Sequence, residues 1–207
     1  MTRTLIRIVA FVAIVAPTLH LISDIMEWSI GGYSRIQLLI NYMGFVPVPF
    51  LILGLYAVQR PKIGLLGLTG SILYGIAFIY FAHTTLFAYE ESFANYEALW
   101  DRLGNVYTFH GGLMVFGGLL FGFASLKVRV LGQKWIILFI FGLSLNFVLA
   151  FLPIPDVIQT IGSLFRNIGM IGIGFGLMGS VETADIPSLN NLESDTNPLE
   201  HTKSDFI

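Results

Sequence analysis

Six long apolar stretches constrain the fold of this chain more than any other feature. They run from about Thr4 to Trp28, Ile36 to Val58, Ile63 to Phe87, Val106 to Leu126, Trp135 to Leu152 and Val157 to Met178. Each has close to the roughly 20 residues that a helix needs to cross a bilayer. The apolar runs are continuous, whereas the strands of a membrane barrel alternate between apolar and polar residues. We therefore predict an all-α, polytopic membrane bundle of six transmembrane helices.

The composition agrees with one membrane domain and a short polar tail. The chain is 55% hydrophobic and 12% charged, whereas ordinary globular chains carry about 25% charged residues. The connections between the apolar stretches are short, so residues 1–180 are predicted to form a single six-helix domain. Residues 181–207 are polar and acidic and are predicted to be disordered. The chain has no cysteine, which excludes disulfides, thiolate ligands and iron–sulfur clusters.

Basic residues gather on alternate connections. Arg3 and Arg7 lie at the N-terminus, Arg60 and Lys62 in the second connection, and Lys127, Arg129 and Lys134 in the fourth. The other connections contain only Arg35 and Arg102. Because cytoplasmic loops of membrane proteins are enriched in lysine and arginine, we predict a multi-pass protein of the cell membrane with both termini in the cytoplasm.

The longest connection, from Tyr89 to Gly104, is acidic and aromatic. Phe93, Tyr96 and Trp100 recur in it at helical spacing. This pattern is typical of a short helix that rests on the membrane surface, where it could act as a lid or as a cation-attracting rim over a site. The alternative is a solvated acidic loop.

Prolines indicate where helices bend and end. Pro17, Pro47 and Pro49 lie inside apolar stretches, and each removes a backbone donor, so kinks are expected in the first two helices. Near the sixth helix, Asp156 precedes Gln159 by three residues. That spacing is typical of a helix N-cap with its capping-box partner.

The rare polar residues of the apolar stretches fall at one depth. In the predicted topology the outer third of five helices holds His20, Asp24, His83, His110, Asn146 and Arg166. Ionisable groups inside a bilayer are costly and usually have a partner or a function. His20, Asp24 and Glu27 are spaced i, i+4, i+7 and so share one helix face. The sequence therefore predicts a polar site in the outer half of the bundle.

Three chemical interpretations of this site remain open. His20, His83 and His110 could be metal ligands, because neutral imidazoles suit zinc. Asp24 could then be a fourth ligand, a hydrogen-bond partner of a ligating histidine, or the catalytic base. Arg166 could hold an anionic substrate group or stabilise charge in the transition state, as in a zinc-dependent, lipid-directed hydrolase. A b-type haem held by two of the histidines is a further alternative. The third interpretation is a non-enzymatic membrane protein whose polar layer is an interhelical hydrogen-bond network.

Two local resemblances carry further expectations. The segment from His20 to Trp28, with Ser23-Asp24, and the early histidine His110 of the fourth helix resemble bacterial six-helix membrane proteins related to the fibroblast-growth-factor-receptor-activating-protein and autophagy-modulator group. The segment from Tyr80 to Leu86, which contains His83, is similar to a helix of the alkaline-ceramidase-type intramembrane hydrolases. Both resemblances imply contact with lipids. The expected partners are the bilayer and either a lipid substrate or another membrane protein, and no nucleic acid.

Overall fold

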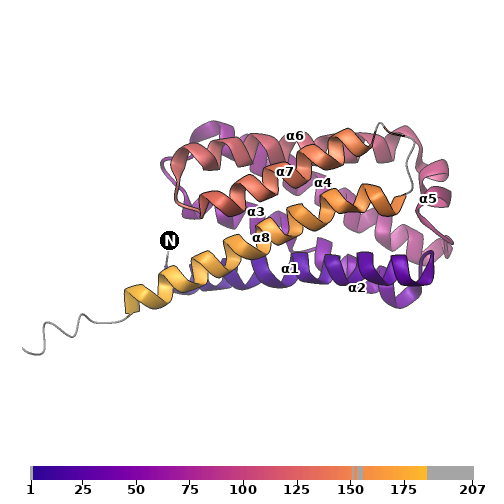
Figure 1. The fold of residues 1–207 in the computed structure, drawn as a ribbon, viewed down its shortest axis with the longest axis horizontal. Helices are drawn as coiled ribbons and strands as arrows, with labels where there is room; N and C mark the ends of the chain where they lie inside the picture. The colour runs from indigo at the N-terminus through magenta and orange to yellow at the C-terminus, as the bar shows by residue number, and fades with distance from the viewer. Residues whose placement is uncertain (1, 151, 153–155, 186–207) are drawn as a thin grey trace, which may run out of the picture.

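The described residues of the chain are helical. The computed structural model describes residues 2–150, 152 and 156–185, and no strand occurs among them. The helices, drawn in Figure 1, are α1 (Arg3–Ile30), α2 (Arg35–Phe45), α3 (Val48–Val58), α4 (Gly64–Glu91), α5 (Tyr96–Leu103), α6 (Asn105–Val128), α7 (Gln133–Leu149) and α8 (Asp156–Asp185). The all-α prediction is confirmed for this part of the chain.

Five segments are long and apolar enough to cross a membrane. They are α1, the α2–α3 pair taken as Arg35–Val58, α4, α6 and residues Thr160–Val181 of α8. The fifth apolar stretch of the sequence forms α7, which is apolar but has only 17 residues. The architecture is therefore compatible with an integral membrane protein.

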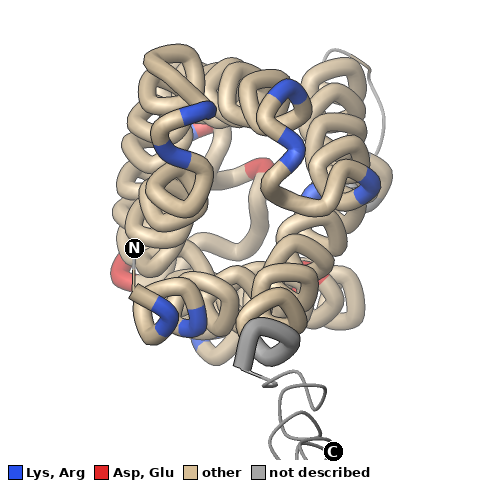
Figure 2. Tube along the Cα trace, turned by 90° about the vertical axis from the view of Figure 1, so that its left-hand side faces the viewer, with Lys and Arg blue, Asp and Glu red and all other residues tan. Residues whose placement is uncertain are grey.

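The helices form a closed ring. Each of α1, α2–α3, α4, α6, α7 and α8 packs against the next in chain order, and α8 returns to pack against α1. Figure 2 shows this ring along its axis. Antiparallel neighbours joined by short connections are the expected result of an up-and-down chain path. The ring brings the first and the last helix into contact.

Proline shapes the second segment of the ring. Pro47 separates α2 from α3 and occupies the N-cap position of α3, with Pro49 in its first turn. A proline has no N–H to donate to the preceding turn, so the helix is interrupted here as the sequence predicts. Pro17, in contrast, lies inside α1, which continues without a break to Ile30.

Glycines allow α7 and α8 to approach closely. A Cβ atom at Gly142 of α7 would collide with the backbone of Gly162 and Arg166 in α8, and one at Gly162 would collide with Asn146. Small residues at such crossings let helix backbones meet in membrane proteins. The crossing holds the backbone of Arg166 directly against α7.

The helix α5 covers one end of the ring (Figure 1). Its N-cap is Asn95, whose Oδ1 accepts a hydrogen bond of 2.9 Å from the N–H of Ala98. Leu99 is only 3% exposed and packs with Leu38 of α2 and Ala88 of α4. The helix predicted from the aromatic spacing is therefore confirmed over Tyr96–Leu103, while its place on the membrane surface stays a prediction.

The two ends of the ring differ in charge. Lys and Arg gather at the end that holds the N-terminus (Figure 2). The α3–α4 and α6–α7 connections, with their predicted basic residues, turn at this end, whereas α5 covers the other. The asymmetry that the sequence predicted between alternate connections is thus an asymmetry between the two ends of the molecule.

The last helix is longer than the sequence indicated. The predicted tail begins at residue 181, but α8 continues to Asp185, and Val181 is 5% exposed. The packed face therefore extends past the predicted domain boundary. α8 begins at Asp156 as expected, although the side chains of Asp156 and Gln159 and all of residues 186–207 lie outside the described part.

Candidate functional site

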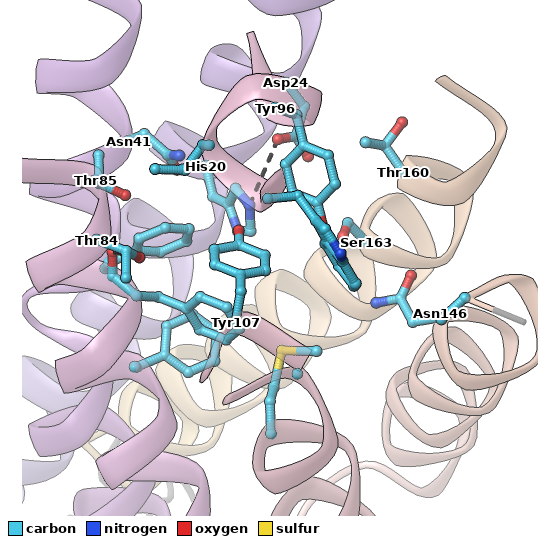
Figure 3. A pocket seen from close by; sticks show the side chains of 18 of the residues that line it. His20, Asp24, Asn41, Thr84, Thr85, Tyr96, Tyr107, Asn146, Thr160 and Ser163 are labelled. Carbon is cyan, nitrogen blue, oxygen red and sulfur yellow. Dashed lines mark hydrogen bonds and ion pairs between the residues drawn. The ribbon is translucent and has the colours of Figure 1, made fainter. Parts of the chain in front are cut away.

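The ring encloses a pocket of about 500 Å³ at the end covered by α5. Seven of the helices, all except α3, contribute residues to its lining. Figure 3 shows Asn41, Thr84 and Thr85 on one side of the pocket and Asn146, Thr160 and Ser163 on the other. A volume of this size is in the range of pockets that hold small molecules, roughly 300–1,000 Å³.

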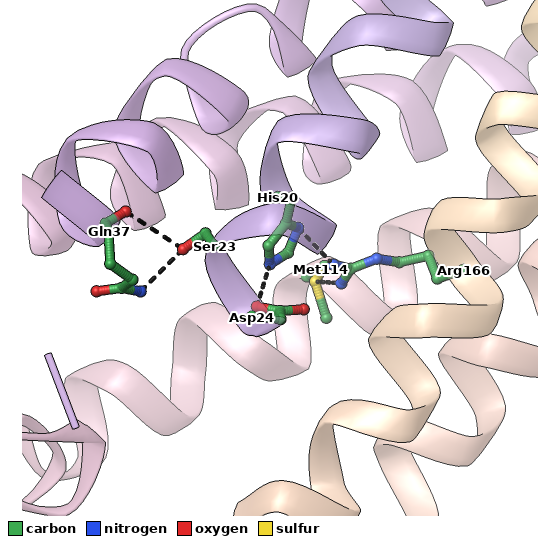
Figure 4. A network of polar contacts seen from close by, with 6 residues as sticks. All are labelled: His20, Ser23, Asp24, Gln37, Met114 and Arg166. Carbon is green, nitrogen blue, oxygen red and sulfur yellow. Dashed lines mark hydrogen bonds and ion pairs between the residues drawn. The ribbon is translucent and has the colours of Figure 1, made fainter. Parts of the chain in front are cut away.

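His20 lies between Asp24 and Arg166 (Figure 4). Nη2 of Arg166 lies 3.2 Å from Nδ1 of His20, and Nε2 of His20 lies 3.5 Å from Oδ1 of Asp24. Because a guanidinium can only donate, Nδ1 must accept. The ring proton then belongs on Nε2, which faces the carboxylate of Asp24. The imidazole thus links a cation on α8 to an acid on α1.

Arg166 is a deeply buried cation. The residue is 2% exposed, and it lines the pocket. Its Nη1 donates to Sδ of Met114 at 2.8 Å, and its guanidinium lies 5.6 Å from the ring centroid of Phe78. With Nδ1 of His20, these are a weak sulfur acceptor, an aromatic face and a neutral nitrogen. None of these three neighbours carries a negative charge.

Several polar atoms at the pocket remain unsatisfied within the described part of the chain. Nε of Arg166, Oδ2 of Asp24 and Oδ1 of Asn41 are buried and have no hydrogen-bond partner there. A buried donor or acceptor without a partner costs about 1–3 kcal/mol, and more when it is charged. All three residues line the pocket. The residues that line the pocket therefore carry donors and acceptors that the described structure leaves unsatisfied.

Aromatic rings form much of the remaining wall. Phe45, Phe78 and Phe81 pack edge to face or tilted on one another and line the pocket near His20. Nearer α5, the rings of Tyr96, Trp100 and Tyr107 lie 5.4–5.7 Å apart. The pocket therefore combines a small polar cluster with a large apolar surface, which is typical of small-molecule sites.

The structure separates His20 from the other two predicted histidines. His20 lines the pocket, but His83 is exposed on α4, and the described lining includes neither His83 nor His110. The ring of His110 stacks on Tyr80, with centroids 4.2 Å apart and an interplanar angle of 7°. The structure therefore does not support one cluster of the three histidines with Asp24 and Arg166, because residues at one depth can lie on different helix faces.

This separation also argues against the metal and haem interpretations. Among the described residues, no group of three or more His, Asp or Glu side chains is arranged to hold a metal ion. Both nitrogens of His20 already face partners, so neither has a lone pair directed at the pocket. The structure therefore does not support zinc on His20, His83 and His110, nor His20 as an axial ligand of haem.

Some of the other polar residues line the pocket, whereas others form hydrogen bonds between helices. Glu27 lines the pocket, as its spacing with Asp24 predicts, and Ser163 lines it three residues before Arg166 on α8. Ser23 points away from it and accepts a 2.8 Å hydrogen bond from Nε2 of Gln37 (Figure 4). Met114, the acceptor for Arg166, carried no signal in the sequence. Its role depends on the rotation of α6 relative to α8, which no spacing pattern encodes.

Comparisons with known proteins add no assignment. No protein-family model matches the chain, and no curated protein or solved structure matches it. The two local resemblances of the sequence therefore stay predictions, and the functional argument depends on the pocket itself.

Proposed function

We propose that this chain is a six-span protein of the cell membrane, with both termini in the cytoplasm, that binds an amphipathic molecule through an anionic headgroup. The place of α7 in the ring supports the sixth span, because it packs between α6 and α8. The basic end of the ring supports the orientation, because basic residues are enriched on the cytoplasmic side. The pocket then opens in the outer half of the bundle.

The observation that carries the proposal is the state of Arg166. A guanidinium that is 2% exposed, lines a pocket of about 500 Å³ and keeps an unpartnered Nε is prepared for an acceptor. Arginine binds carboxylates and phosphates with charge-assisted, often bidentate hydrogen bonds. An anionic group in the pocket would satisfy this cation. Arg166 then takes the anion-binding role that the sequence suggested.

The wall of the pocket supports an apolar body on the same ligand. The aromatic side chains of Phe45, Phe78 and Phe81 offer no charge and contact one another around the polar cluster. Burial of apolar surface contributes roughly 25 cal/mol per Å². A ligand with an anionic head and a short apolar chain would contact both parts of the site, and phospholipids of the surrounding bilayer have this chemistry.

Titration of short-chain lipids into the purified full-length protein tests the proposal. Dihexanoyl phosphatidic acid and dihexanoyl phosphatidylethanolamine carry the phosphate, and dihexanoylglycerol has the same chains without it. We expect saturable binding of the phosphate-bearing lipids, reported by the fluorescence of Trp100 or by calorimetry. Arg166→Gln should weaken that binding by about tenfold or more.

The matched control is Arg60→Gln, which removes an exposed cation at the opposite end of the ring. It should bind like the unmodified protein. Equal binding of dihexanoylglycerol, or equal binding of phosphate-bearing lipids by the Arg166→Gln variant, would overturn the proposal.

A further inference from the structure

We infer that the ligand is zwitterionic, with an ammonium group held by Asp24 beside the anionic group held by Arg166. This inference rests on the proposed function, because it adds a positively charged group to the ligand of the same pocket. It depends on three features of the pocket, namely an unsatisfied acid, a cluster of aromatic rings and the balance of charge. None of these features is needed for the binding of an anion alone.

The first feature is the carboxylate of Asp24. One oxygen, Oδ1, faces His20, while the other, Oδ2, is buried and has no hydrogen-bond partner in the described structure. A carboxylate oxygen can only accept hydrogen bonds when ionised. The carboxylate or fully ionised phosphate that suits Arg166 cannot satisfy it, because such a group offers no donor. An ammonium group on the same ligand offers up to three.

The second feature is an aromatic cluster from α5 and α6 that lines the same pocket as Asp24. Tyr96 and Trp100 of α5 and Tyr107 of α6 line the pocket, with ring centroids 5.4–5.7 Å apart. Asp24 and Tyr96 both line the pocket, and Figure 3 labels both. Faces of aromatic rings attract cations, and they do so more strongly when water is excluded. Rings next to an acid are the usual surroundings of a bound ammonium group.

The third feature is the balance of charge in the lining. Among the described residues that line the pocket, Asp24 and Glu27 are acids, and Arg166 is the one lysine or arginine. A purely anionic ligand would therefore bring a third negative group next to two acids. A zwitterion places a positive group beside Asp24 and Glu27 and a negative group beside Arg166, so both ends of the site are complemented.

The order of the side chains along α1 determines which charged end of the ligand lies nearer α5. His20, which contacts Arg166, lies one helical turn from Asp24, and Glu27 lies nearly one further turn toward α5. At 1.5 Å per residue, the acids extend roughly 6–10 Å from His20 toward α5. The anionic group should thus lie deeper and the ammonium group nearer α5. A phospholipid with an ethanolamine headgroup and a small soluble zwitterion both fit this chemistry.

The same binding assay, extended to Asp24→Asn, tests the inference. Dihexanoyl phosphatidylethanolamine and dihexanoyl phosphatidic acid differ by the amine, so their affinity ratio measures the ammonium site. We expect the unmodified protein to prefer the amine-bearing lipid by about tenfold. Asp24→Asn should reduce that ratio to about threefold or less, because an amide does not carry the charge that attracts the ammonium group. Glu91→Gln, which removes an exposed acid at the end of α4, should leave the ratio unchanged.

Free phosphoethanolamine distinguishes a lipid from a soluble ligand. If it competes as well as the lipid, the zwitterion comes from solution, and if it competes weakly, the apolar chains are part of the ligand. Either result supports the inference when Asp24→Asn removes the preference. Equal affinity for both lipids, with an Arg166-dependent signal, would overturn the inference and leave the proposed function intact. Failure of both lipids to bind would overturn both.

Discussion

Nδ1 of His20 lies 3.2 Å from Nη2 of Arg166, although the two residues are 146 positions apart. The contact joins α1 to α8. The other ring nitrogen of His20, Nε2, lies 3.5 Å from Oδ1 of Asp24, so the three side chains form one network. A network of this kind is coupled, because loss of one member leaves another buried group without its partner.

This coupling predicts a non-additive pair of substitutions. His20→Phe should destabilise the protein by about 1–3 kcal/mol, because it leaves a buried donor of Arg166 unsatisfied. In the double variant His20→Phe with Arg166→Met, the loss should be smaller than the sum of the two single losses by about 0.5–3 kcal/mol. Reversible unfolding in mixed micelles measures these values. His83→Phe, at an exposed site, serves as the control, and additive losses would contradict the network.

The close crossing of α7 and α8 predicts opposite effects for two glycines. Gly142→Ala places a methyl group against the backbone of Arg166, and it should cost about 1–3 kcal/mol through forced helix separation. Gly176→Ala meets nothing within 4 Å, so it should be neutral or stabilise by up to about 1 kcal/mol through helix propensity. Thermal unfolding of the two variants gives the comparison. Equal midpoints would show that the crossing is not as tight as described.

The helix α5 should open locally when its anchor is removed. Leu99→Ala removes the α5 residue that is buried between Leu38 and Ala88. The expected cost of about 2–5 kcal/mol should appear as faster hydrogen exchange in residues 93–104, with little change in the ring. Hydrogen exchange with mass spectrometry reports each segment separately. Exchange that rises equally in α6 would indicate that α5 is an integral part of the ring.

Ser23 and Asp24 are neighbours in sequence but should have separable roles. Ser23→Ala removes the acceptor for Nε2 of Gln37, and it should lower stability by about 1 kcal/mol without changing ligand affinity. Asp24→Asn should change ligand preference instead. Unfolding and lipid titration of both variants separate stability from binding. A Ser23→Ala variant with altered lipid preference would show that the two faces of α1 are not independent.

The absence of cysteine makes the topology directly measurable. Single substitutions Glu91→Cys and Lys62→Cys place a thiol at either end of α4. In intact cells, a membrane-impermeant maleimide should label the first and not the second, because basic connections face the cytoplasm. Permeabilised cells provide the control for reactivity. Labelling of both residues in intact cells would rule out the proposed orientation.

The length of the apolar stretches was sufficient to predict long helices, and the spacing of polar residues predicted one face of the site. The spacing of His20, Asp24 and Glu27 placed them on one side of α1, and all three line the pocket. The same reasoning applied within α4 would have excluded His83. That residue precedes the lining residue Thr85 by two positions, or about 200° around the helix. Depth alone was therefore a weaker guide than helix rotation.

Contacts between helices could not be predicted in the same way. The pairing of Arg166 with Met114 and Phe78 depends on the rotations of three helices and on the order of the ring. A single sequence records the apolar character of each helix but not which neighbour it meets. The closure of α8 on α1 and the bridging position of His20 therefore required the structure.

The closure of the ring by its last helix has a consequence for biogenesis. A chain synthesised from its N-terminus inserts α1, with His20 and Asp24, long before the ribosome has made Arg166. Until α8 arrives, the polar face of α1 has no guanidinium to meet, and the interior of the ring stays open toward lipid. In the proposed membrane topology, translation thus leaves an acid and an imidazole without their guanidinium partner for most of the assembly time, which is costly inside a bilayer. A truncated chain that ends before α8 should be recognised by membrane quality control and degraded.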